Sequence, residues 1–273
     1  MTGMGKRGES SVIFNSINGK RGQVTIFIII AVVIVALGAA IYLFYPQISS
    51  TFGGEQDANS FIQTCIEDEI QENVETVSLQ GGGLNPELHI LYLDEKIEYL
   101  CYTEKYSQLC IVQRPLLDNS IESEIENGIE EEVKNCFSQL QSNFESRGYD
   151  VTMREGDIKV ELLPQRIVST FNYTVTFDRA GETQRYESFN AILNNNLYEL
   201  IGIANNIIDW ESTYGNAETT LYMDLYHNLK VEKKKPEYGT DVYILTERTT
   251  GDKFQFATRS LVTAPGYGIA YAE

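Results

Sequence analysis

The longest apolar run of the chain lies near its start. From Val24 to Tyr45 every residue is apolar except Thr25 and Gly38, and residues 22–54 carry no charge. As a helix, this run would be about 33 Å long, enough to cross a hydrocarbon core of about 30 Å. Soluble helices are rarely apolar on all sides over so many turns. The pattern predicts a transmembrane helix at 23–45, after a leader at 1–22 and before a juxtamembrane hinge at 46–56.

A cleaved secretory signal is the alternative interpretation of the same run. The small residues from Gly38 to Ala40 are typical of a signal-peptidase cleavage site. The apolar run, however, is longer than the 7–15 residues of an ordinary secretory signal. The anchor therefore remains the favoured interpretation.

Amphipathic helices are predicted at four places after the hinge. The first begins at Asp57 or Asn59 and stops at Gly81. The second covers 120–147, with Asn119 and Glu122 as a capping pair and Gly148 as the stop. Shorter helices are expected over 196–210 and 217–227. The stripes of the two long helices recur at intervals of three and four residues: Ile62, Ile66, Ile70, Val74 and Val77 in the first, and Ile121, Ile125, Ile129 and Val133 in the second.

Strand patterns fill the intervals between these helices. Residues 88–113 are expected to form strands around a polar turn at 103–108. A β-rich part follows Gly148, including a strictly alternating stretch at 171–177 and a strand at 184–192, and the last hairpin pairs 241–246 with 253–259. Lys233 to Pro236 is interpreted as a loop tip. The expected fold is α+β: a transmembrane helix, then a region 57–148 of helices and a hairpin, then a β-rich region 149–273 with antiparallel strands.

Charge is distributed unevenly along the chain. The net charge is −18, but the leader carries four basic residues against one acidic residue, while residues 23–273 hold 17 basic and 38 acidic residues. The basic end belongs in the cytoplasm, which places the acidic part outside the cell. So acidic a chain argues against a nucleic-acid partner, and two histidines argue against a histidine-rich metal site.

Four cysteines allow three disulfide pairings. Cys101 and Cys110 flank the expected hairpin, whereas Cys65 and Cys136 lie on or near the apolar stripes of the long helices. These positions predict the disulfides Cys65–Cys136 and Cys101–Cys110. A zinc site is the weaker alternative because no two cysteines have the usual close spacing. Unpaired buried thiols are the other alternative.

The junction from Lys20 to Thr25, Lys-Arg-Gly-Gln-Val-Thr, resembles an archaeal class III signal of the type IV pilin-like kind. The resemblance implies that a prepilin peptidase cuts between Gly22 and Gln23 and that the apolar helix stays on the mature protein. It also implies other pilin-like subunits as partners. Pilins usually carry Glu at the fifth mature position, where this chain has Phe27. An ordinary basic flank is the alternative interpretation of the junction.

The remaining layout resembles a group of uncharacterised archaeal membrane-anchored proteins. The shared features are a cysteine in the first outer helix, the sequence Leu79–Gly82, a cysteine near the end of the second helix, and the strand Phe254–Ala257. This resemblance supports location and architecture but implies no activity.

No enzyme motif is present in the sequence, so no catalytic, cofactor-binding or metal-binding residue is predicted. Asn172 begins the sequence Asn-Tyr-Thr and is a candidate glycosylation site. His227 near Asp224 is interpreted as a surface pair, and the acidic run Glu122–Glu132 as a solvated helix face.

The function expected from the sequence is that of a pilin-like, membrane-anchored cell-surface protein without catalytic activity: a minor pilin, an adhesin or a surface-structure component. It would reside in the cell membrane with an extracellular C-terminal part, or in a surface filament. The alternative is an anchored extracellular binding or scaffold protein that does not polymerise, which Phe27 favours. An extracellular enzyme without a recognisable motif is the third reading.

Overall fold

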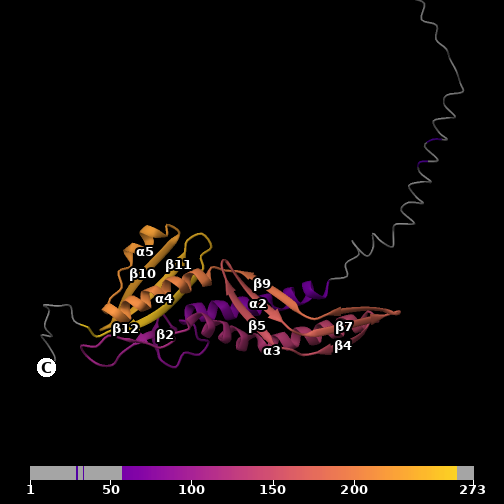
Figure 1. Ribbon diagram of the computed structural model, residues 1–273, viewed down its shortest axis with the longest axis horizontal. Coiled ribbons are helices and arrows are strands. Elements are labelled where there is room, and N and C mark those ends of the chain that lie inside the picture. Colours follow the sequence, from indigo (N-terminus) through magenta and orange to yellow (C-terminus); the bar gives the residue numbers. More distant parts are fainter. Residues whose placement is uncertain (1–28, 30–32, 34–56, 263–273) are drawn as a thin grey trace, which may run out of the picture. The chain divides into compact units, whose positions relative to one another are not determined.

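A computed structural model of the chain describes Ile29, Val33 and residues 57–262 (Figure 1). Residues 57–262 belong to one compact α+β unit. Its helices are α2 (Ala58–Leu79), α3 (Leu117–Ser146), α4 (Leu197–Tyr214) and α5 (Thr220–Leu225). Its strands are β1 (His89–Tyr92), β2 (Glu95–Tyr102), β3 (Ile111–Val112), β4 (Asp150–Arg154), β5 (Ile158–Leu163), β6 (Arg166–Phe171), β7 (Thr174–Arg179), β8 (Glu182–Tyr186), β9 (Phe189–Asn194), β10 (Leu229–Glu237), β11 (Thr240–Glu247) and β12 (Lys253–Arg259).

The expectation of a membrane-spanning helix requires correction. Within the part of the chain that the structure describes, no helix is both long enough and apolar enough to cross a bilayer. The two long helices, α2 and α3, each bury one stripe and carry many acidic residues elsewhere, so neither suits a hydrocarbon core. The leader 1–22, the segment 23–45 and the hinge 46–56 lie outside the described residues, apart from Ile29 and Val33.

Helices α2 and α3 pack side by side along their apolar stripes (Figure 1). The predicted stripe residues of both helices are buried. Gly128 permits the close approach, because a Cβ atom at this position would collide with the Asn73 side chain of α2. The predicted glycine stops are also present: Gly81 and Gly148 both adopt positive φ just after the helices end.

The predicted starts of the two long helices had different outcomes. Asp57 occupies the N-cap position of α2 as predicted, although its side chain makes no capping hydrogen bond, whereas α3 begins earlier than predicted. Helix α3 begins at Leu117, and no side chain caps its N-terminus. Instead of capping α3, Glu122 accepts a hydrogen bond from the backbone N–H of Leu162. Asp57 and Asn59 likewise reach other elements, where they accept hydrogen bonds from the Tyr186 hydroxyl and the backbone N–H of Asn190. These polar side chains therefore form hydrogen bonds with other elements and do not cap their own helices.

Two three-stranded antiparallel sheets join α2 and α3 to form what we call the two-helix region (α2, α3 and β4 to β9). The strand orders are β4-β7-β8 and β5-β6-β9, with α2 against β9 and α3 against β5. The alternating stretch at 171–177 is divided between β6 and β7, yet Phe171, Tyr173, Val175 and Phe177 are all buried. The Phe137 ring stacks on the Tyr173 ring, with 4.1 Å between the ring centres, and meets the Phe189 ring edge-on, with 5.0 Å between the centres. These rings form an aromatic core.

The remaining elements form what we call the mixed-sheet region (β1 to β3, α4, α5 and β10 to β12). The strand order is β1-β2-β12-β11-β10, with β3 also on β2, and α4 packs against β11 and β12. The last hairpin pairs as predicted, from Asp241 opposite Thr258 to Thr246 opposite Lys253. Strand β12 runs parallel to β2, although only antiparallel pairing was expected. Lys233 to Pro236 lies within β10, so its interpretation as a loop tip was wrong.

Candidate functional site

One disulfide fastens each region. Cys65 of α2 is bonded to Cys136 of α3 with 5.9 Å between the Cα atoms, and Cys101 of β2 is bonded to Cys110 with 5.3 Å. These are the two pairs that the hairpin and stripe positions predicted. Each bond restricts the unfolded chain and thereby stabilises the folded one.

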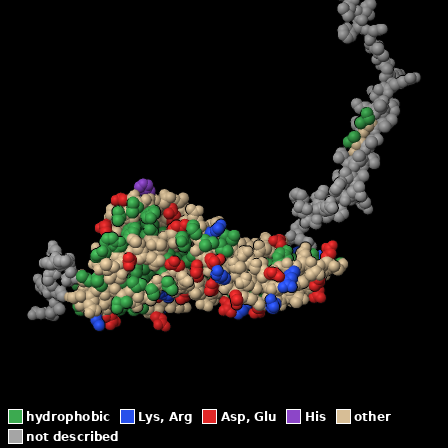
Figure 2. All heavy atoms as spheres, in the orientation of Figure 1, with side chains coloured by type: hydrophobic (Ala, Val, Ile, Leu, Met, Phe, Trp, Pro, Cys, Tyr) green, Lys and Arg blue, Asp and Glu red, His purple; other side chains and the backbone are tan. Residues whose placement is uncertain are grey.

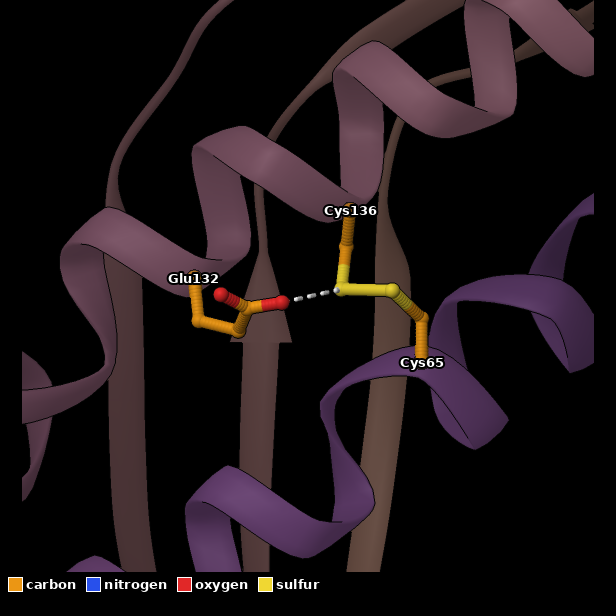
Figure 3. A group of neighbouring side chains, drawn as sticks. All are labelled: Cys65, Glu132 and Cys136. Carbon is orange, nitrogen blue, oxygen red and sulfur yellow. Dashed lines mark hydrogen bonds between the residues drawn. A yellow bond between two sulfur atoms is a disulfide. The ribbon is translucent and has the colours of Figure 1, made fainter.

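A carboxylate lies beside the inter-helix disulfide (Figure 3). Glu132, one helical turn before Cys136, places its Oε1 atom 3.8 Å from the Cys136 sulfur. The ligand atoms of Glu132, Cys65 and Cys136 lie within 4.8 Å of one another, which is close enough for one metal ion. Both sulfurs are committed to the disulfide, however, and metal binding by cysteine requires thiolates. In this state the cluster is a covalent link between the two helices.

A buried ionic network connects α4 with β10 and β11. The Glu211 side chain, 1% exposed, lies 3.1 Å from Lys233 Nζ, and Asp241 lies 3.1 Å from the same nitrogen. Glu211 Oε1 also accepts hydrogen bonds from the Tyr243 hydroxyl and from the backbone N–H of Ala217. Glu211 Oε2 is buried without a hydrogen-bond partner. Burying several charged and polar groups costs folding free energy unless each finds a hydrogen-bond or ionic partner. In this network Glu211 Oε2 has none.

The tyrosine of this network is strongly perturbed. Burial, followed by the charge of Glu211 and the hydrogen bond to it, raises the pKa of Tyr243 far above its ordinary value of 10.0. The Lys233 ammonium lies over the Tyr243 ring, 4.9 Å from its centre, as a cation–π contact. The phenol therefore stays protonated and continues to donate to Glu211 across the physiological pH range.

An apolar groove of about 860 Å³ runs between α4 and α5. Leu221, Leu225 and Tyr226 line it while remaining 54%, 66% and 55% exposed. The carboxylates that line it are Glu199 and Glu247. Figure 2 shows hydrophobic side chains gathered over the α4 and α5 end of the molecule on the visible face. Exposed apolar side chains grouped in a concave surface are typical of binding sites.

The acidic run of α3 differs from its interpretation as a wholly solvated face. Glu122 and Glu126 accept hydrogen bonds at 2.9 Å from the backbone N–H groups of Leu162 and Val160 in β5. Glu124 accepts from Leu84 and forms an ion pair with Arg114. These carboxylates satisfy the free edge of β5 and a loop, which gives them a structural role.

The other residues singled out from the sequence are distributed as follows. Asn172 lies exposed between β6 and β7, so its side chain is accessible, and its glycosylation stays a prediction. Gly22 and Gln23 lie outside the described residues. His227 is exposed and lines the groove.

Sequence reasoning missed the network of Glu211, Lys233 and Tyr243. One signal was present: the alternation of Leu229, Val231 and Lys233 places the lysine on the inward face of a strand. Nothing in the sequence indicated that a carboxylate of α4 would meet that lysine.

Comparison with known proteins adds no relative from which an activity is transferable. The chain matches no protein-family model, no curated protein and no solved structure.

Proposed function

We propose that this chain is a cell-surface protein without catalytic activity, whose mixed-sheet region binds another protein. The single observation that carries the proposal is that all four cysteines are engaged in disulfides. Disulfides persist in oxidising compartments outside the cytoplasm and are rare within it. The acidic surface and the pilin-like junction at Lys20–Thr25 agree with a surface location.

The groove between α4 and α5 supports the binding role. Leu221, Leu225 and Tyr226 offer apolar contact, and Glu199 and Glu247 supply negative charge around it. Charge complementarity favours a partner segment that combines apolar residues with lysine or arginine. This proposal suits a surface-structure component, in which the segment belongs to a neighbouring subunit. It equally suits a binding or scaffold protein that does not polymerise.

Labelling of intact cells tests the location. A membrane-impermeant amine reagent is applied before lysis, and labelling is read at Lys235, whose side chain is 70% exposed. We expect Lys235 to be labelled on intact cells as fully as in a lysate. Labelling that appears only after lysis would contradict the proposal. Mass spectrometry of the same sample tests the predicted processing, which gives a mature start at Gln23.

Peptide binding tests the groove. The probes are an amphipathic leucine–lysine peptide and its leucine–glutamate counterpart, applied to the full-length protein. We expect the lysine peptide to bind more tightly and Leu225→Asn to weaken it about tenfold, since one apolar contact of about 1.5 kcal/mol is lost. Leu91→Asn is the matched control, because Leu91 is 65% exposed on β1 and outside the groove. Equal binding of both peptides, or no effect of Leu225→Asn, would reject the groove as the binding site.

A further inference from the structure

An amine, a carboxamide and a carboxylate meet where α4 ends above β10. Lys233 Nζ lies 2.7 Å from Asn216 Oδ1 and 3.1 Å from Glu211 Oε1. The left-handed Gly215 ends α4 and turns the chain, so that Asn216 follows directly after the turn. The Lys233 side chain is only 14% exposed and the Glu211 side chain 1%. Glu211 lies in α4, Asn216 in the loop after it and Lys233 in β10. The lysine and the asparagine are 17 residues apart in the chain.

We propose that Lys233 and Asn216 become joined by an amide bond between their side chains, with release of ammonia and with Glu211 as the proton carrier. The nucleophile is the Lys233 amine, and the electrophile is the Asn216 Cγ atom. The hydrogen bond from Nζ to Oδ1 already holds these groups in contact. Such fixed proximity replaces an intermolecular encounter and accounts for much of the rate of intramolecular reactions.

The proton and electron balance closes within the three side chains. The Lys233 ammonium first gives a proton to the Glu211 carboxylate, which frees the nitrogen lone pair. That lone pair forms the new bond to Cγ, and the carbonyl electrons move onto Oδ1. Glu211 then passes its proton to Nδ2 and takes one from Nζ. When the carbonyl re-forms, the Cγ–Nδ2 bond breaks and ammonia leaves, while the last proton stays on Glu211.

The surroundings suit each of these steps. Glu211 Oε1 lies 3.1 Å from Lys233 Nζ and is the oxygen placed to take the proton. The Tyr243 hydroxyl and the Ala217 N–H fix its position, and Oε2 is buried without a partner. The Tyr243 ring and Asp241 hold the lysine nitrogen from the other sides. Asn216 itself is exposed, which gives the ammonia a direct path into solvent. The bond would fix the end of α4 to β10.

Mass spectrometry of the full-length protein tests this bond directly. We expect the intact mass to be lower by one ammonia than the sequence requires, after correction for two disulfides and the mature N-terminus. We also expect trypsin to leave the chain uncut after Lys233 and to yield a branched peptide that joins Lys233 to Asn216. Asn216→Ala changes an exposed side chain, so it should fold normally, regain the full mass and restore cleavage after Lys233.

Two further variants identify the chemistry. Glu211→Gln should leave the lysine and asparagine unlinked, because the proton carrier is lost. Lys234→Arg is the matched control, since it changes the neighbouring lysine of β10 and should keep the bond. A wild-type protein of full mass overturns the proposal. So does loss of ammonia with Lys233 and Asn216 in separate tryptic peptides, because the ammonia then left another site, such as a cyclic imide at asparagine or a cyclised N-terminal Gln23.

Discussion

The two-helix region and the mixed-sheet region use their apolar and polar residues in opposite ways. In the two-helix region the aromatic rings are inside, and strands β4 to β8 expose no large apolar side chain among the described residues. The mixed-sheet region buries an ionic network and exposes large apolar side chains, including Leu93 and Leu225 at 79% and 66%. Figure 2 shows the contrast on one face.

This difference indicates that the two-helix region mainly stabilises the fold, whereas the mixed-sheet region also offers a surface for contact with a partner. Burial of apolar surface is the main source of folding free energy. The rings around Phe137 supply it in the two-helix region, and Tyr243, Phe254 and Phe256 are buried in the same continuous core. An exposed apolar side chain contributes little to folding and is available for contact with a partner. A buried ion pair is weak support for stability, which leaves the Glu211 network open to another role.

The disulfides provide the largest expected difference between the regions. Replacing both Cys65 and Cys136 by alanine removes a cross-link over 71 residues, whereas the Cys101–Cys110 link spans 9. From the entropy of the unfolded chain, the free energy of unfolding should fall by about 4.4 kcal/mol without Cys65–Cys136 and by about 2.7 kcal/mol without Cys101–Cys110. Guanidinium unfolding of the two double variants measures both losses. Equal losses would mean that the two-helix region does not depend on its cross-link more than the mixed sheet does.

Truncation of Phe137 comes next. This side chain is fully buried among Tyr173, Phe171 and Phe189, so Phe137→Ala should lower the free energy of unfolding by about 4 kcal/mol. Leu225→Ala in the groove is the comparison, and its cost should stay within about 0.5 kcal/mol because the side chain is exposed. Urea or guanidinium titration gives both values. A large cost for Leu225→Ala would erase the proposed division between a stabilising core and a contact surface.

Alkaline pH probes the buried network. The pKa of Tyr243 is raised by its burial and by Glu211, so the folded protein holds this proton at pH values where the unfolded chain releases it. Stability from this group is therefore complete below about pH 10 and falls as the pH rises, with the folding constant dropping about tenfold per pH unit. Tyr243→Phe should make the decline shallower by that amount, whereas the exposed Tyr198→Phe should leave it unchanged. Parallel declines in wild type and Tyr243→Phe would show that the phenol is not the group responsible.

The smallest expected effect is at the helix carboxylate that meets β5. Burial raises the pKa of Glu122, and the hydrogen bond from Leu162 only partly offsets this effect. Because the charged form is penalised in the folded state, wild-type stability rises as the pH falls through the range where Glu122 takes up its proton. Glu122→Gln keeps an acceptor oxygen and should stabilise by less than about 1 kcal/mol at neutral pH. The gain should disappear in acid, and the exposed Glu131→Gln is the control.

Much of the fold was predictable because local patterns carried it. The i, i+4 stripes of α2 and α3, their glycine stops and the last hairpin depend on residues close together in the chain. The cysteines on these elements then indicated the two pairings that the structure contains. The prediction of a membrane-spanning helix was not met, because none of the described helices is long and apolar enough to cross a bilayer.

The features of the fold that the sequence did not predict depend on contacts between residues far apart in the chain. The parallel pairing of β12 with β2 joins residues far apart in the chain, such as Ala257 and Tyr99, which are 158 positions apart, and no local pattern indicates it. Glu122 matched a capping box but binds β5 instead. Lys233 lies in a run of three lysines that was interpreted as a loop tip, although it alternates with Leu229 and Val231, and it pairs with Tyr243 in the sheet.

Trapping of thiols in living cells tests the central claim most directly, that this domain works outside the cytoplasm with its disulfides closed. Cells are quenched with acid, free thiols are alkylated, and the protein is digested without reduction. The account predicts unalkylated cysteines in two linked peptides, one joining Cys65 to Cys136 and one joining Cys101 to Cys110. Four alkylated cysteines would contradict it.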